Sequence, residues 1–416
     1  MLDAEIIAIG SELLTPDRSD TNSLWITGKL NEIGIDVKLK TIVGDDELRL
    51  EEAISDALKR SDVVITTGGL GPTDDDITRQ MAANAAGREL EYHDELEAML
   101  RERFRHWGKE MPEINKRQAW VLKGAEVIPN PNGSAAGMLL EEDGKFLIVL
   151  PGPPRENQPM FEASVFERLK ARAGNVFVKR QIMRVSGLGE SAVDEAIAPI
   201  YREFKDVQTS ILFNKTEIEI QLTAKSASEA EADRLLAELS EKIAEKLGVA
   251  VFAQSGELME EVVGRMLTER GQTLATAESC TGGLIGERLT EIAGSSKYFM
   301  EGIISYSNDA KMRTLNVPKE ILKQFGAVSH QTAEAMAKGV RERADTDHGI
   351  SVTGVAGPDG GSEEKPVGTV FIGYASRDEV KSIKLMLPGD RYLIRWRSSQ
   401  AALDYLRRQM LKAAKQ

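Results

Sequence analysis

The sequence is poor in cysteine and histidine. Its single cysteine, Cys280, excludes a disulfide within the chain. Its four histidines are scattered and show none of the paired spacings that bind structural zinc. Long apolar runs are missing as well, since no stretch approaches the ~20 residues needed to cross a bilayer. We therefore expect neither a disulfide-stabilised domain, nor a zinc domain, nor a membrane protein.

Positive charge is also scarce. The 53 Lys and Arg residues are outnumbered by 66 Asp and Glu residues, which gives a net charge of −13. Because nonspecific binding to nucleic acid depends on clustered Lys and Arg, we expect no nucleic-acid partner. The opening segment MLDAEIIAIGSELL lacks the basic region of a signal peptide. This segment and the lone cysteine indicate a cytoplasmic protein.

What the sequence does contain is a regular alternation of strand-like and helix-like segments. A chain of 416 residues is too long for one hydrophobic core. Over residues 1–172 the alternation predicts a parallel sheet covered on both faces, with the charged stretch 91–118 as a helical excursion. Residues 173–255 follow a βαββαβ pattern, and residues 256–416 return to an α/β pattern. We therefore predict three α/β domains with these bounds.

The segment AESCTGGLIGERLT carries the clearest candidate site. A strand is expected to end at Ser279 and a helix to start near Gly282, which places Ser279 on an exposed strand-to-helix turn. The N–H groups of Thr281, Gly282 and Gly283 would lie at the helix N-terminus, where they favour a phosphate or an oxyanion. The same pattern also fits Ser279 and Thr281 as simple helix caps. The pattern alone leaves both interpretations open.

A serine nucleophile needs a base, and no histidine motif supplies one. Tyr306 is expected at a strand end, and Lys311 follows five residues later near a helix start. A desolvated lysine, or a tyrosine polarised by it, can activate serine, although a single lysine is more often solvated. Cys280 is the rival nucleophile, because a helix N-terminus can lower the pKa of its thiol.

Six ordered blocks resemble the C-terminal domain of the CinA family, the nicotinamide-nucleotide amidase: AESCTGG, GSS (294–296), SYSNDAK, GAVS (326–329), TGVAGPDGG and KPVGTV (365–370). The resemblance implies hydrolysis of nicotinamide mononucleotide to nicotinate mononucleotide and ammonia, without a cofactor. It implies Ser279 as the nucleophile and Tyr306 and Lys311 as the activating pair. The substrate-binding positions that it implies are Glu278, Cys280, Thr281, Gly282, Gly283, Thr353, Gly354, Ala356, Gly357 and Arg395.

The N-terminal part is similar to the molybdopterin-binding MoCF-like domain in its CinA version. The similarity lies in IGSELL, DTN (20–22), VGDD, GGLGPTDDDIT and LPGPPRE, while SGLGES (186–191) and the βαββαβ unit match the middle domain of full-length CinA. Such members resemble an ADP-ribose pyrophosphatase that needs a divalent metal (Mg²⁺, Mn²⁺ or Co²⁺). The resemblance implies metal ligands at Asp45 and Asp76 and a ligand site at Gly10, Glu12, Asn22, Gly68, Gly69, Gly71 and Thr73.

Two hypotheses of different classes remain. The first is a bifunctional cytoplasmic enzyme, expected from the family to be a homodimer, that deamidates nicotinamide mononucleotide and cleaves ADP-ribose. The second is a binding protein whose N-terminal domain only recognises a pterin or nucleotide, linked to competence or DNA damage. The run Asp74 to Asp76 fits both, because acidic residues there also complement a helix dipole. Ser11 and Asn157 depart from the pattern expected of the N-terminal domain.

Overall fold

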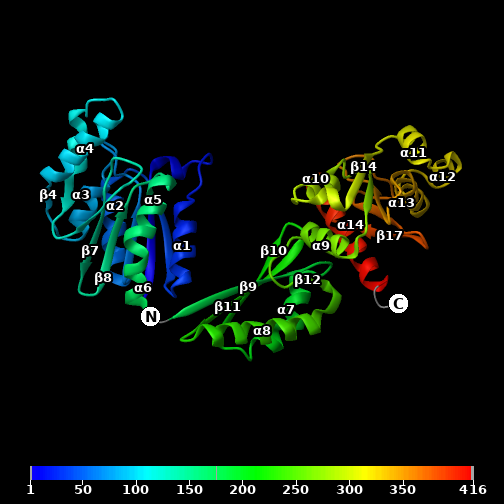
Figure 1. The fold of residues 1–416 in the computed structure, drawn as a ribbon, viewed down its shortest axis with the longest axis horizontal. Coiled ribbons are helices and arrows are strands. Elements are labelled where there is room, and N and C mark those ends of the chain that lie inside the picture. The colour runs from blue at the N-terminus through cyan, green and yellow to red at the C-terminus, as the bar shows by residue number, and fades with distance from the viewer. Residues whose placement is uncertain (1, 175, 414–416) are drawn as a thin grey trace. The chain divides into compact units, whose positions relative to one another are not determined.

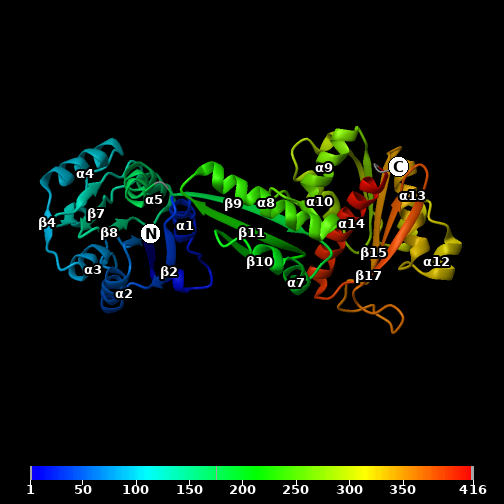
Figure 2. The same cartoon turned by 90° about the horizontal axis from the view of Figure 1, so that it is seen from below.

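The computed structural model describes residues 2–174 and 176–413. They divide into two compact units. The first unit comprises Met1–Lys179 and Lys225–Ala232, and the second comprises Arg180–Ala224 and Asp233–Gln416. Each unit contains its own hydrophobic clusters. The elements are labelled in Figure 1 and appear from a second direction in Figure 2.

The first unit is built on a six-stranded sheet. Four neighbouring strands run parallel, as predicted, but the next strand runs antiparallel to them, and the edge strand beyond it pairs with that strand in antiparallel fashion as well. The difference arises because the last two long strands are joined by a tight turn at Asp143 and Gly144, both with positive φ. In sheet order the strands are β2 (Asp36–Val43), β1 (Asp3–Ile9), β3 (Val63–Thr67), β8 (Lys145–Leu150), β7 (Gly137–Glu142) and β6 (Glu126–Ile128).

Helices cover both faces of this sheet (Figure 1). One face packs against α1 (Asn22–Glu32), α5 (Pro154–Met160), a π-helix (Phe161–Phe166) and α6 (Glu167–Ala173). The other face packs against α2 (Glu47–Arg60) and α3 (Thr78–Ala85). The predicted helical excursion forms α4 (Asp94–His106) and a 3₁₀ helix (Glu113–Ala119), between β4 (Leu90–Tyr92) and β5 (Trp120–Leu122) of a separate two-stranded sheet.

The middle segment has the predicted βαββαβ order. Its four strands form a sheet in the order β10-β11-β9-β12. Ile218, Ile220 and Leu222 are fully buried, which confirms the alternation seen in the sequence. The elements are β9 (Phe177–Val185), α7 (Glu190–Tyr201), β10 (Val207–Asn214), β11 (Glu217–Ser226), α8 (Glu229–Leu247) and β12 (Val251–Ala253).

The rest of the second unit is a five-stranded sheet between two layers of helices. In sheet order its strands are β14 (Phe299–Ile304), β13 (Leu274–Glu278), β15 (His348–Gly354), β16 (Thr369–Ala375) and β17 (Val380–Met386), of which the first three are parallel. One face packs against α9 (Met259–Arg270), α10 (Leu284–Thr290) and α14 (Arg391–Ala413), and the other packs against α11 (Asn308–Leu315), α12 (Lys319–Phe325) and α13 (His330–Ala344). None of the described helices is long and apolar enough to span a bilayer.

Candidate active site and ligand cavity

Ser279 lies where the central strand β13 ends. All five residues of β13 are buried between β14 and β15, and the Ser279 N–H donates to the Val352 carbonyl at 3.0 Å, which extends the strand pairing by one residue. The chain then turns through Gly282 and Gly283, whose φ values of 62° and 98° suit glycine. The carboxyl ends of parallel strands are where open α/β sheets bind ligands. The turn therefore places Ser279 at the functional edge of this sheet.

Lys311 reaches Ser279 from α11. Its Nζ lies 3.0 Å from the Ser279 Oγ, and its side chain is 1% exposed. Lys311 is thus no solvated surface lysine. The prediction that the turn exposes Ser279 is wrong, because the residue is only 8% exposed with the Lys311 side chain lying against it. The spacing of these residues in the sequence did not reveal how deeply the pair is buried.

The surroundings of Lys311 suit a neutral amine. The Nζ lies 2.8 Å from the Ser305 carbonyl oxygen and 3.3 Å from the Tyr306 carbonyl oxygen. A neutral amine has two N–H donors for these two carbonyls and one lone pair, which then faces the Ser279 hydroxyl. Burial lowers the pKa of Lys311 from its ordinary value, because desolvation disfavours the charged form. The geometry therefore fits Lys311 as a base toward Ser279.

The other two reactive candidates lie in different surroundings. The Tyr306 ring is 63% exposed, and its hydroxyl lies 3.4 Å from Arg391 Nη2, so Tyr306 contributes its backbone carbonyl to Lys311 rather than a hydroxyl. Cys280 is buried in the hydrophobic cluster, and burial raises the pKa of its thiol to about 12. The thiol is therefore protonated at neutral pH, which makes it a poor nucleophile.

The N–H groups of the turn divide into two sets. Gly282 donates to the Ser279 carbonyl at 3.2 Å, and Gly283 donates to the buried Glu278 carboxylate at 3.0 Å. Glu278 also accepts from Ile285 and Gly286, so it caps the N-terminus of α10. In the described chain the N–H groups of Cys280 and Thr281 donate to no carbonyl or carboxylate. These two donors, rather than the two glycines, are available for an oxyanion.

Helix α14 holds the loops around Ser279. Arg395 donates from Nε and Nη2 to the Thr281 carbonyl at 3.2 and 2.8 Å, and Arg391 donates to the Gly357 carbonyl at 2.7 Å. Of the predicted binding residues between 353 and 357, Thr353 near the end of β15 donates from its hydroxyl to the Ala327 carbonyl, and Ala356 in the following loop lies in the hydrophobic cluster. The side chains of Thr353 and Ala356 are therefore occupied in packing and hydrogen bonding within the domain.

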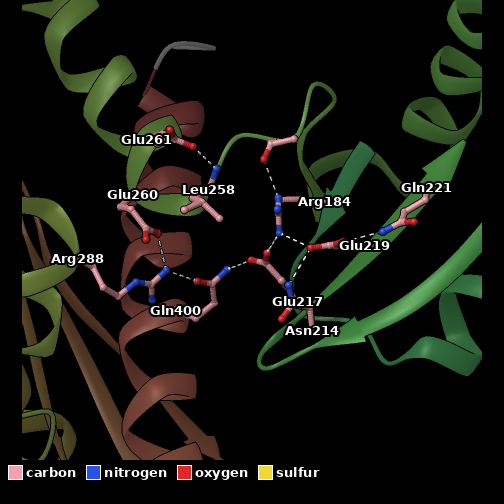
Figure 3. A network of polar contacts seen from close by, with 11 residues as sticks. Arg184, Asn214, Glu217, Glu219, Gln221, Leu258, Glu260, Glu261, Arg288 and Gln400 are labelled. Carbon is pink, nitrogen blue, oxygen red and sulfur yellow. Dashed lines mark hydrogen bonds and ion pairs between the residues drawn. The ribbon is translucent and has the colours of Figure 1, made fainter. Parts of the chain in front are cut away.

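A buried polar network fixes α10, the helix that follows the Ser279 turn. Figure 3 shows Arg288 of α10 donating to Glu260 of α9 and to Gln400 of α14, both at 2.6 Å. Gln400 in turn donates to Glu217 of β11 at 2.9 Å, and Glu217 pairs with Arg184 of β9. Burial raises the pKa of Glu217. Within the second unit, the middle sheet is thus connected to the helices that position Ser279.

The N-terminal site is a cavity of about 370 Å³ at the carboxyl ends of β1, β3 and β8. At this edge Gly68 lies so close to the Ile9 carbonyl oxygen that a Cβ would overlap it. Of the predicted residues, the cavity is lined by Gly10, Glu12, Asp45, Gly68, Gly69, Gly71 and Asp76. Asn22 and Thr73 lie outside the lining, because Asn22 donates to the Gly152 carbonyl and Thr73 donates to Asp76.

Asp45 and Asp76 are already bonded to the loops of this cavity. Asp76 accepts from the Gly71 N–H at 2.7 Å and from the Thr73 N–H and hydroxyl at 2.9 and 2.5 Å, while Asp45 accepts from the Ser11 N–H at 2.9 Å. Among the described residues, no group of three or more His, Cys, Asp or Glu is arranged to hold a metal ion. The side chains therefore do not fit a preassembled metal cage, and the divalent metal stays a prediction.

Several residues of both sites carry no clear signal in the sequence and were not predicted. In the N-terminal cavity the buried Glu156 accepts from Asn130 at 2.8 Å, and a Cβ on Gly133 would overlap its carboxylate. Glu156 belongs to the LPGPPRE block, which was the available signal, whereas nothing in the sequence singled out Asn130. In the C-terminal site, Ser305 gives its carbonyl to Lys311 and is fully buried. Such backbone roles leave little trace in a side-chain pattern.

Comparisons with known proteins cover nearly the whole length of the chain. Family models match in order: the "Probable molybdopterin binding domain" over residues 5–171, the "Damage-inducible protein CinA KH domain" over 180–253 and the "CinA C-terminal domain" over 256–410. A CinA-like protein of Solibacter usitatus is 46% identical over 409 residues, covering 98% of each chain. One of Koribacter versatilis is 44% identical, covering 98% of this chain and all of that relative. The crystal structure of a competence/damage inducible protein from Agrobacterium tumefaciens is 44% identical over 38% of this chain and 96% of its own, with a TM-score of 0.35.

Proposed function

The chain belongs to the CinA family, and on this basis we propose that its C-terminal domain hydrolyses the carboxamide of nicotinamide mononucleotide to nicotinate mononucleotide and ammonia. The observation that carries the proposal is the buried contact of 3.0 Å between Lys311 Nζ and Ser279 Oγ. A serine next to a desolvated lysine is a pairing used for attack on amide carbonyls.

The proposed reaction uses the chain's own residues for each proton. The neutral Lys311 amine takes the Ser279 hydroxyl proton while Oγ attacks the carboxamide carbon, and the carbonyl oxygen becomes an oxyanion. Collapse of this intermediate breaks the carbon–nitrogen bond, and the Lys311 ammonium returns its proton to the departing ammonia. Lys311 then removes a proton from a water molecule that attacks the ester, and its ammonium gives this proton to the departing Ser279 Oγ, which releases nicotinate mononucleotide and restores both Ser279 and the neutral amine.

The oxyanion would be bound by the N–H groups of Cys280 and Thr281. Both follow the nucleophile directly, and neither is bonded to a carbonyl or carboxylate in the described part of the chain. The N–H of the residue after a nucleophile is a common oxyanion donor. Loss of one such donor typically costs a factor of about 10²–10³ in kcat. Cys280 thus contributes through its backbone, whereas its thiol stays protonated.

The test is ammonia release from nicotinamide mononucleotide by the purified full-length chain. We expect Ser279→Ala to lower turnover by about 10³-fold or more, since it removes the nucleophile. The matched control is Cys280→Ala, which changes the adjacent buried side chain and is expected to keep at least about a tenth of the turnover. Full turnover by Ser279→Ala would overturn the serine mechanism, and no ammonia release by the unaltered protein would overturn the proposed activity.

The N-terminal cavity supports a second proposal, which is binding and cleavage of ADP-ribose. Its glycine loops allow close backbone approach to a pyrophosphate. Five carboxylates also line it, so a phosphate would need a cation to offset their charge: Glu12, Asp45, Asp75, Asp76 and Glu156. We expect AMP release from ADP-ribose only when Mg²⁺, Mn²⁺ or Co²⁺ is present. Binding without AMP release would favour the binding-protein hypothesis, and homodimerisation stays a prediction.

A further inference from the structure

A second cavity of the first unit lies outside both sites described above. It measures about 550 Å³ and is lined mainly by α4, the loop 129–136 and the π-helix. Its lining is mostly apolar, with Leu96 and Met99 from α4, Pro129 and Pro131 from the loop, and Ala163 from the π-helix. An open cavity of this size and character suits the apolar part of a small molecule.

This apolar cavity adjoins the glycine-loop cavity, because Gln118 and Ser134 line both. Gln118 is held in place, since it donates to the Leu70 carbonyl at 3.2 Å and accepts from Asn115 at 3.0 Å. A ligand anchored at the glycine loops would pass Gln118 and Ser134 to reach the apolar cavity.

The polar side chains that line the apolar cavity indicate which kind of ligand group could bind there. Beside Gln118 and Ser134, these are Glu95, Arg103, Asn130 and Ser164, of which Arg103 donates to the Asn130 carbonyl at 2.6 Å. Flat apolar walls of proline, leucine and methionine with a few hydrogen-bonding groups suit a planar ring that carries polar edge atoms. Such a ring is found at the end of a nucleotide opposite its phosphates.

We propose that the apolar cavity binds the heteroaromatic ring of a nucleotide whose phosphates lie in the glycine-loop cavity. The proposal rests on the second proposed function, and it assigns the ring of that ligand to residues of α4, the loop 129–136 and the π-helix. The glycine loops then recognise the diphosphate, and the apolar cavity selects ligands that carry a base.

The experiment compares two probes, ADP and pyrophosphate, by calorimetric titration in Mg²⁺. Ala163→Trp fills the apolar cavity from an exposed position, and Glu167→Trp places the same side chain on an exposed position outside the lining. We expect the unaltered chain to bind ADP more tightly than pyrophosphate. Ala163→Trp should weaken ADP binding by about tenfold or more and change pyrophosphate binding by less than about twofold, while Glu167→Trp changes neither.

The titration with pyrophosphate distinguishes failure of the ring assignment from failure of the second proposed function. If Ala163→Trp leaves ADP binding unchanged, or weakens both probes equally, the ring assignment is overturned although the phosphate site stands. If the unaltered chain binds neither probe, the second proposed function and the ring assignment fail together. Retained pyrophosphate binding by Ala163→Trp also shows that the variant is folded.

Discussion

The two sites of this molecule hold their polar groups in opposite ways. In the C-terminal site, Ser279 and Lys311 are buried and contact each other directly, and two backbone carbonyls orient the amine. In the N-terminal cavity, the Asp76 carboxylate is bonded to its own loop, and most of the lining is backbone and acidic side chains. The first arrangement fits the proton transfer that we propose, whereas the second is a cavity lined by carboxylates, in which the proposed binding of a phosphate would require a cation.

This contrast indicates where each site is vulnerable. A buried pair depends on single atoms, so one substitution removes its chemistry without changing its shape. A loop-built cavity depends on backbone conformation, so it is most sensitive to changes that move the loop. The following predictions test this contrast, beginning with the largest expected effect.

Replacing Lys311 by methionine removes the amine while keeping an unbranched side chain. We expect Lys311→Met to lower the rate of ammonia release by about 10²–10⁴-fold, the range for loss of a general base. Circular dichroism checks that the variant folds, and AMP release from ADP-ribose provides an internal reference in the other unit. A loss below about threefold would mean that another group activates Ser279.

Replacing Gly71 by alanine tests the loop-built cavity. The new Cβ would overlap the Asp76 carboxylate, which accepts from the Gly71 N–H, so either the carboxylate gives up this bond or the loop moves. We expect Gly71→Ala to weaken ADP binding by about 10-fold to 100-fold, measured by titration calorimetry. Ammonia release should stay within about twofold of the unaltered chain, because the residues proposed for the amidase lie in the other compact unit. An equal loss of ADP binding and ammonia release would contradict the view that the two sites depend on different features.

The pH dependence of ammonia release tests the buried pair. Because burial lowers the pKa of Lys311, kcat/KM should rise about tenfold per pH unit below that pKa and level off before pH 10.5. Between the lowered pKa and 10.5 the unfolded chain binds more protons than the folded one, so the free energy of unfolding rises with pH in this window. Lys311→Met should lose that slope. A rate that rises only through pH 10.5 would indicate a solvated lysine.

Gln400 tests the network that holds α10. Gln400→Leu leaves Arg288 its contacts with Glu260 and Ser399 but removes the link to Glu217. We expect the free energy of unfolding to fall by about 1–3 kcal/mol, measured by urea denaturation, because buried polar groups lose partners. Gln409→Leu is the matched control, since the Gln409 side-chain oxygen on the same helix is buried and has no partner among the described residues. An equal loss in both variants would remove any special role for Gln400.

Much of the fold and part of the site follow from the sequence. The βαββαβ order and the alternation in β11 are local patterns, and local periodicity determines them. The antiparallel edge of the first sheet could not be predicted, because strand direction depends on the turn at Asp143 and Gly144. The burial of Ser279 could not be predicted either. It depends on which strands lie on either side of β13, and this pairing joins residues far apart in the sequence.

The choice between Tyr306 and Lys311 shows the same limit. Spacing placed both near one cleft, but only the structure shows the lysine turned inward and the tyrosine turned outward. For Asp76 the resemblance implied a metal ligand. In the structure its carboxylate also accepts hydrogen bonds from the Gly71 N–H and the Thr73 hydroxyl, and so holds the Gly71 loop. Sequence motifs identify which residues matter more reliably than what each atom contacts.

The contacts of α14 also constrain how this chain can change in length. Arg391, Arg395 and Ser399 are spaced by four residues, and they contact the 357 loop, the Ser279 turn and Arg288 in turn. Inserting or deleting one residue between Arg395 and Ser399 would rotate the two halves of the helix by about 100° relative to each other. One half of the helix would then lose its hydrogen bonds to the loops and to Arg288. Single substitutions on this helix leave the relative orientation of the three contacting residues unchanged, whereas insertions and deletions alter it. We therefore expect the length of this helix to be among the least variable features of related chains.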